Sequence, residues 1–94
     1  MALARVVSFD GVGKDRVEEM KREMEAREGP EGMPPAEVVV LHDPEAEKSV
    51  VILFFESESD YATADAILDA MPASDTPGRR SSVTKYDVVA RTTM

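Results

Sequence analysis

The hydrophobic residues of the chain are most concentrated at residues 50–55, where every position is apolar. Side chains that follow one another in a strand point to opposite faces. The two faces carry Val50, Ile52 and Phe54 on one side and Val51, Leu53 and Phe55 on the other. A β-branched start and an aromatic end favour a strand over a short buried helix. Because both faces are apolar, the sequence predicts a central strand that is covered on both sides.

Three further segments have the composition of strands. Residues 3–9 alternate, with one face carrying Leu3, Val7 and Phe9 and the other carrying Ala4, Val6 and Ser8. Residues 36–42 are rich in valine and precede Asp43-Pro44, which are residue types that a type I turn prefers at its first two positions. We therefore expect this segment to form a hairpin with the central strand. Residues 82–91 mix apolar and charged positions on one face, which is typical of an edge strand.

Two other segments have helical spacing. In residues 14–28, an apolar stripe of Val17, Met20 and Met24 is surrounded by charged positions, and the glycines and prolines of residues 29–35 end the helix. A second helix begins at Ser57, whose hydroxyl is placed to cap it, and ends before Pro72. Its apolar face contains Tyr61, Ala64, Ile67, Leu68 and Met71.

The resulting order of elements is β-α-β-β-α-β, two split βαβ halves joined by a hairpin. Right-handed crossovers place both helices on one face of a four-stranded antiparallel sheet, with the first and third strands in the centre. The predicted fold is therefore α+β and ferredoxin-like. It leaves one apolar face of the third strand without a helix to cover it.

Composition limits the classes of function. A chain of 94 residues is expected to form one domain, residues 1–94. It contains no cysteine, which excludes a disulfide framework and a thiolate metal site, and its net charge of -8 opposes binding to nucleic acid. No apolar run approaches the ~20 residues of a membrane span, and the first residues lack the core of a signal peptide. We therefore expect a cytoplasmic protein that binds neither nucleic acid nor membranes.

Three segments together resemble a known family. They are residues 6–9 (VVSF) before an acidic helix, residues 51–60 (VILFFESESD), and residues 82–89 (SVTKYDVV). The most specific part is the step from aromatic to acidic to serine residues between the third strand and the second helix. In this pattern the chain resembles the dimeric α+β barrel superfamily, and in particular its antibiotic-biosynthesis monooxygenase-like domains.

The resemblance implies a homodimer in which two sheets meet through their helix-free faces. It also implies a cleft between sheet and helices that binds or oxidises a small apolar molecule, such as a polyketide quinol or heme. Heme is disfavoured because Phe55 stands where heme-degrading members have a tryptophan, and because the second helix contains no histidine. Residues 6–8 also lack the asparagine of those members. We expect no cofactor and no tightly held metal.

The expected site lies in that cleft. Its apolar walls are expected to be Val51, Phe55, Met20, Met24 and Leu68, with Phe55 turned towards the helices beside Leu68 and Met24. The polar candidates are Ser8, Tyr61 and Tyr86. The favoured alternative for each of these is a structural residue whose hydroxyl is satisfied by a neighbour.

Three other features carry weaker signals. Gly11 and Gly13 resemble part of a phosphate-binding loop, but they also suit an ordinary turn. The pair Arg79-Arg80 is the only local positive concentration and would suit an anion, although exposed arginine pairs are common. His42 stands beside Asp43 at a strand end, where it would suit a metal site, a catalytic base or an ordinary hairpin.

Two classes of function therefore stay open. The first is a small-molecule site, catalytic or not, between the sheet and the helices. The second is a non-enzymatic dimerisation or ligand-sensing module whose core is filled. An internal cavity with an unsatisfied polar group would favour the first, and a solid core would favour the second.

Overall fold

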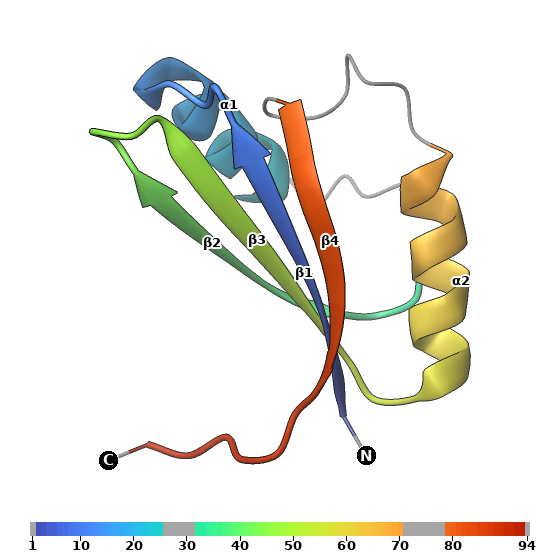
Figure 1. The fold of residues 1–94 in the computed structure, drawn as a ribbon. Helices are drawn as coiled ribbons and strands as arrows, with labels where there is room; N and C mark the ends of the chain where they lie inside the picture. Colours follow the sequence, from blue (N-terminus) through green and yellow to red (C-terminus); the bar gives the residue numbers. More distant parts are fainter. Residues whose placement is uncertain (1, 26–31, 71–78, 94) are drawn as a thin grey trace.

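The chain forms a four-stranded antiparallel sheet with two helices (Figure 1). The computed structural model describes residues 2–25, 32–70 and 79–93, with side chains in the first helix described as far as Arg22. The elements are β1 (Leu3–Asp10), α1 (Lys14–Glu25), β2 (Glu37–Asp43), β3 (Lys48–Phe55), α2 (Glu58–Asp69) and β4 (Arg79–Asp87). The strand order β2-β3-β1-β4 confirms the predicted ferredoxin-like fold, with the first and third strands central.

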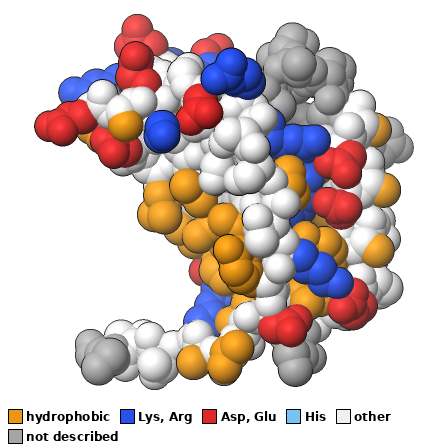
Figure 2. Space-filling view, viewed as in Figure 1, with side chains coloured by type: hydrophobic (Ala, Val, Ile, Leu, Met, Phe, Trp, Pro, Cys, Tyr) orange, Lys and Arg blue, Asp and Glu red, His pale blue; other side chains and the backbone are white. Residues whose placement is uncertain are grey.

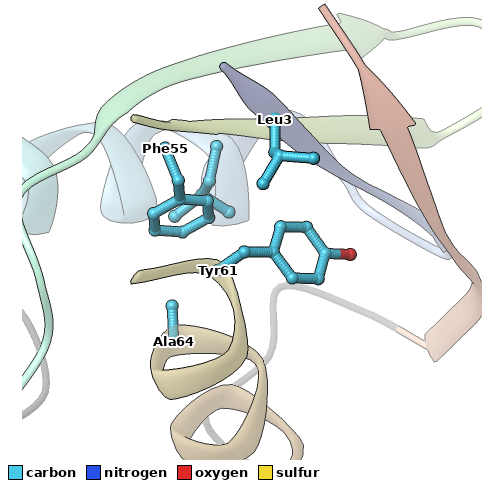
Figure 3. Close-up of a cluster of buried hydrophobic side chains, with 5 residues drawn as sticks. Leu3, Phe55, Tyr61 and Ala64 are labelled. Atoms are coloured by element: carbon cyan, nitrogen blue, oxygen red, sulfur yellow. The ribbon is translucent and has the colours of Figure 1, made fainter. Parts of the chain in front are cut away.

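The alternation of β3 separates its two apolar faces as predicted. Leu53 and Phe55 are buried on the helix side, and the ring of Phe55 meets that of Tyr61 edge to face at a centroid distance of 5.8 Å (Figure 3). Leu3 and Ala64 complete this cluster. Leu68 packs against it, whereas the side chain of Met24 lies outside the described residues. The predicted orientation of Phe55 towards the helices is therefore confirmed.

A second cluster joins β1 to the start of α1. Val7, Phe9 and Val12 are buried together, and Val17 of α1 packs against them. The backbone N–H of Val12 donates to the carbonyl of Glu47 at 2.7 Å, which ties the segment after β1 to the β2–β3 hairpin. Over its described residues α1 packs less closely on the sheet than α2 does. None of the helices in the described ranges is long and apolar enough to cross a membrane.

Two local signals in the sequence are confirmed. The carboxylate of Asp43 accepts hydrogen bonds from the backbone N–H groups of Glu45 and Ala46 at 3.1 and 3.2 Å, and this closes the hairpin between β2 and β3. The hydroxyl of Ser57 accepts from the backbone N–H of Asp60 at 3.2 Å and caps the start of α2.

The bounds of β4 differ from those predicted. The strand begins at Arg79 instead of residue 82 and ends at Asp87 instead of residue 91. Its partner β1 decides both limits, because Asp10 pairs with Arg79 at one end and Leu3 pairs with Asp87 at the other. Beyond Asp87, one further backbone hydrogen bond joins the N–H of Val88 to the carbonyl of Ala2, which directly precedes β1. Residues 88–93 are consequently not part of the sheet.

The face of the sheet away from the helices is apolar and uncovered in the single chain. Figure 2 shows hydrophobic side chains gathered on a hollowed side of the sheet, between the β2–β3 hairpin and the C-terminal segment. The strand register assigns to this helix-free face Ala4, Val6, Ser8, Val39, Leu41, Val50, Ile52, Phe54, Ser82, Thr84 and Tyr86. Leu41 is 51% exposed and Tyr86 is 55% exposed. The register also places charged residues on this face, at the ends of the strands: Asp10, Glu37, Asp43, Lys48 and Arg79.

The C-terminal segment borders this face. Arg91 forms an ion pair with Glu37 at the start of β2, and its guanidinium lies 4.3 Å from the ring centroid of Phe54. The segment therefore reaches from the β4 edge of the sheet to the β2 edge. Val89, within it, is 93% exposed.

One charged side chain is buried on the helix side. Arg5 is 2% exposed, and its guanidinium donates to Asp65 at 2.9 Å and to Asp69 at 3.2 Å. The two aspartates lie one turn apart on α2, so a single arginine of β1 reaches both. Arg80 of β4 donates to the same oxygen of Asp69 at 3.0 Å. This ion-pair network connects α2 to two neighbouring strands.

We expect Arg5→Ala to lower the free energy of unfolding by about 3 kcal/mol, because it removes a buried stem together with two charge-assisted hydrogen bonds. Arg80→Ala is the matched control, since it removes a contact to the same aspartate from a more exposed position and should cost less than about 1 kcal/mol. Urea unfolding followed by circular dichroism measures both. Equal losses for the two variants would contradict the assignment of Arg5 as the main link.

Candidate functional site

The space between α2 and the sheet is filled by side chains. Four of the residues expected to line a cleft, Val51, Phe55, Tyr61 and Leu68, instead belong to the hydrophobic core or pack against it. Among the described residues every buried side-chain nitrogen or oxygen has a hydrogen-bond partner. This part of the expected site is therefore solid core.

A pocket lies on the same side of the sheet, between α1 and β2. It has a volume of about 270 Å³. Its lining residues are Val17, Met20 and Lys21 from α1 and Val40 and His42 from β2. Three of the five are apolar, and the other two bring a lysine ammonium and an imidazole. The looser packing of α1 on the sheet accounts for the space.

The remaining expected site residues lie in different places. Met20 is buried and lines the pocket. Met24 cannot be assigned, since its side chain lies outside the described part of the chain. The register places Ser8 and Tyr86 on the helix-free face, across the sheet from the pocket. The structure thus divides the expected residues between the α2 core, the α1 pocket and the opposite face.

His42 is held in a defined orientation at the pocket wall. Its Nε2 lies 2.9 Å from the backbone carbonyl of Val12. A carbonyl only accepts, so Nε2 must carry the proton and donate it. The ring nitrogen Nδ1 then remains without a partner among the described residues. The described residues contain no group of three or more His, Asp or Glu side chains that would hold a metal with it.

Sequence reasoning did not select Val17, Lys21, Val40 and His42 together. One signal was available, because Val40 and His42 alternate on one strand face, just as Val17, Met20 and Lys21 recur at helical spacing. What the sequence does not contain is the distance between the helix and the strand. That distance decides whether these residues touch each other or enclose a space.

Tyr61 has a distinct electrostatic environment in the α2 core. Burial and the nearby carboxylate of Asp65 raise its pKa above the ordinary tyrosine value. The ammonium of Lys85 lies 5.0 Å from the centre of its ring and is held by Glu58 at 2.8 and 3.0 Å. That hydrogen bond to Glu58 raises the pKa of Lys85. At neutral pH Tyr61 is therefore a protonated phenol and a hydrogen-bond donor, and it does not act as a base.

The arginine pair does not form an anion site. Arg79 and Arg80 belong to β4, where successive side chains point to opposite faces. Arg80 is occupied by Asp69, and Arg79 stands opposite Asp10. The two side chains therefore do not converge on a shared site. Gly11 has a φ of +72°, which is consistent with the ordinary turn between β1 and α1.

Comparison with known proteins adds no assignment to this site. No protein-family model matches the chain, and no curated protein matches it. The geometry of the pocket and of the helix-free face therefore carries the functional interpretation.

We expect Tyr61 to ionise at a higher pH than an exposed tyrosine. In a Tyr86→Phe variant, which leaves Tyr61 as the one phenol, the phenolate absorbance near 295 nm should rise with a midpoint above about pH 10. Because the folded state favours the protonated phenol, this contribution to stability is fully present below about pH 10 and is lost as the pH rises through the folded-state pKa. A midpoint below that of the urea-unfolded variant would contradict the assignment.

Proposed function

We propose that this protein is a homodimeric domain of the α+β barrel type that binds a small apolar molecule in the pocket between α1 and β2. The observation that carries the binding function is the pocket itself, an apolar space of about 270 Å³ next to a filled core. A cytoplasmic location, expected from the sequence, is part of the same proposal.

The composition of the pocket supports binding of a small molecule. Ligand sites in proteins are mostly apolar hollows of ~300–1,000 Å³ with a few polar groups that orient the ligand. The pocket, at about 270 Å³, lies just below that range, so it suits a molecule of one or two rings better than a nucleotide. Met20 adds an adaptable apolar wall, and the imidazole of His42 adds an oriented polar group.

The helix-free face supports association with a second copy of the chain. Contiguous patches of exposed apolar surface larger than a few hundred Å² are uncommon on monomers and mark interaction sites. The uncharged positions of this face lie together, and its charged residues stand at the strand ends, where Asp10, Asp43, Lys48 and Arg79 form one row and Glu37 is paired with Arg91. Two copies can therefore approach through the uncharged positions with the charged residues at the rim.

The size of the face is compatible with a stable dimer. Four strands of about seven residues cover a footprint of about 450 Å², from a strand spacing of ~4.8 Å and a rise of ~3.3 Å per residue. The accessible area exceeds this footprint, because side chains protrude and the C-terminal segment extends the rim. The footprint alone is about half of the ~800 Å² per partner of a standard interface, and the protruding side chains and the C-terminal segment add to it.

A second candidate function is a dimerisation module without a ligand. The filled core beneath α2 and the satisfied buried polar groups of the described residues favour it. For oxidation of the bound molecule, which the resemblance implies, the two nearest candidate groups already have structural roles. Tyr61 packs in the hydrophobic core, and Nε2 of His42 is hydrogen-bonded to the carbonyl of Val12.

Filling the pocket should weaken the binding of a neutral apolar probe. We expect Val40→Trp, which places an indole in the space, to weaken binding of 2-naphthalenemethanol at least about tenfold. The matched control is Val38→Trp, on the same strand and the same face but outside the pocket, which should bind the probe normally. Isothermal titration calorimetry measures both. Unchanged binding to Val40→Trp, or no binding to the wild type, would contradict the pocket proposal.

The two faces of β3 give a paired test of the dimer. We expect Ile52→Glu to give a folded monomer, because it places a charge on the proposed interface. Leu53→Glu, its neighbour on the helix side, should unfold the chain, because it buries a carboxylate without a partner. Sedimentation equilibrium and circular dichroism distinguish these outcomes. A dimer that persists in Ile52→Glu would overturn the assignment of this face.

A further inference from the structure

The two polar side chains of the α1 pocket indicate the chemical class of its ligand. We propose that the ligand is an apolar molecule that carries one acidic group, a carboxylic acid or a phenol. This inference rests on the proposed binding function of the pocket and adds the charge that the pocket selects.

The polar groups of the pocket come from opposite walls. Lys21 belongs to α1 and His42 belongs to β2, while Val17, Met20 and Val40 provide apolar surface. A lysine ammonium only donates hydrogen bonds and carries a positive charge. Among the described residues that line the pocket none is acidic, although the chain as a whole is strongly acidic. The described lining therefore carries one positive charge, that of Lys21, within a negative protein.

The imidazole of His42 can form a hydrogen bond with either the protonated or the ionised form of an acidic group. Because Nε2 donates to the carbonyl of Val12, Nδ1 is the ring nitrogen that can contact a ligand. In the neutral ring Nδ1 accepts a hydrogen bond from an undissociated acid or phenol, and in the charged ring it donates to the anion. Both states suit an acid, and the ammonium of Lys21 favours the anion further. An amine would meet Lys21 as a like charge.

The volume restricts the apolar part of the ligand. A space of about 270 Å³ accommodates a bicyclic ring system or a short alkyl chain, with the acidic group directed to Lys21 and His42. The inference therefore concerns small aromatic or aliphatic acids and phenols, not long lipids.

Three naphthalene probes of similar shape test the charge preference: 2-naphthoate, 2-naphthalenemethanol and 2-naphthylmethylamine. Each is titrated into ¹⁵N-labelled wild-type protein, and the backbone amide shifts locate the binding site. We expect 2-naphthoate to shift residues of α1 and β2, including Met20 and Val40. Its affinity should exceed that of the amine at least about tenfold, as expected for a charge-assisted hydrogen bond.

Three variants assign the preference to the pocket. Lys21→Met keeps the apolar stem and should weaken 2-naphthoate binding about five- to tenfold while changing binding of the neutral alcohol less than about twofold. His42→Gln, which keeps a donor for Val12, should also weaken 2-naphthoate binding. Lys14→Met, at the start of the same helix and outside the pocket lining, is the control and should behave as the wild type.

The outcomes separate this inference from the proposed function. Equal affinities for the three probes in the pocket would overturn the preference for acids and leave small-molecule binding in place. Equal weakening of the naphthoate and the alcohol by Lys21→Met would overturn it as well. The absence of shifts in α1 and β2 with all three probes would overturn both. Shifts of 2-naphthoate confined to the helix-free face would also overturn both.

Discussion

The architecture depends on the need to cover both apolar faces of β3. On one face, Leu53 and Phe55 are buried beneath α2 by Leu3, Tyr61 and Ala64. On the other face, Val50, Ile52 and Phe54 have no helix over them. A two-layer α+β fold covers only one of these faces with helices. The strand β3 therefore carries more apolar surface than the single chain buries. The proposed homodimer follows from this excess.

The two helices contribute differently to the helix side. An aromatic contact and the ion-pair network of Arg5 hold α2 against the sheet. By contrast, α1 is fixed mainly at its start, where Val12 and Val17 meet the second cluster and Val12 is bonded to the hairpin and to His42. Further along α1, the side chains of Met20 and Lys21 enclose a space instead of filling it. The candidate site is therefore located beside the helix that, over its described residues, packs less closely on the sheet.

Much of the fold was predictable from local chemistry. The alternation of residues 50–55, the Asp43-Pro44 turn and the Ser57 cap each act within a few residues, and the structure confirms all three. The limits of β4 were not predictable in this way, because they are set by the length of β1. The pocket was not predictable because it depends on the distance between α1 and β2. Arg5 shows an intermediate case: alternation places it on the helix side, but only α2 supplies its partners.

The proposed dimer buries the helix-free face of β3 against a second copy of the chain. Native mass spectrometry of freshly purified protein tests it most directly, because one spectrum reports the oligomeric state and any retained small molecule. At micromolar concentration we expect a main species of twice the chain mass of 10.3 kDa. A main species at the mass of a single chain under the same conditions would contradict it.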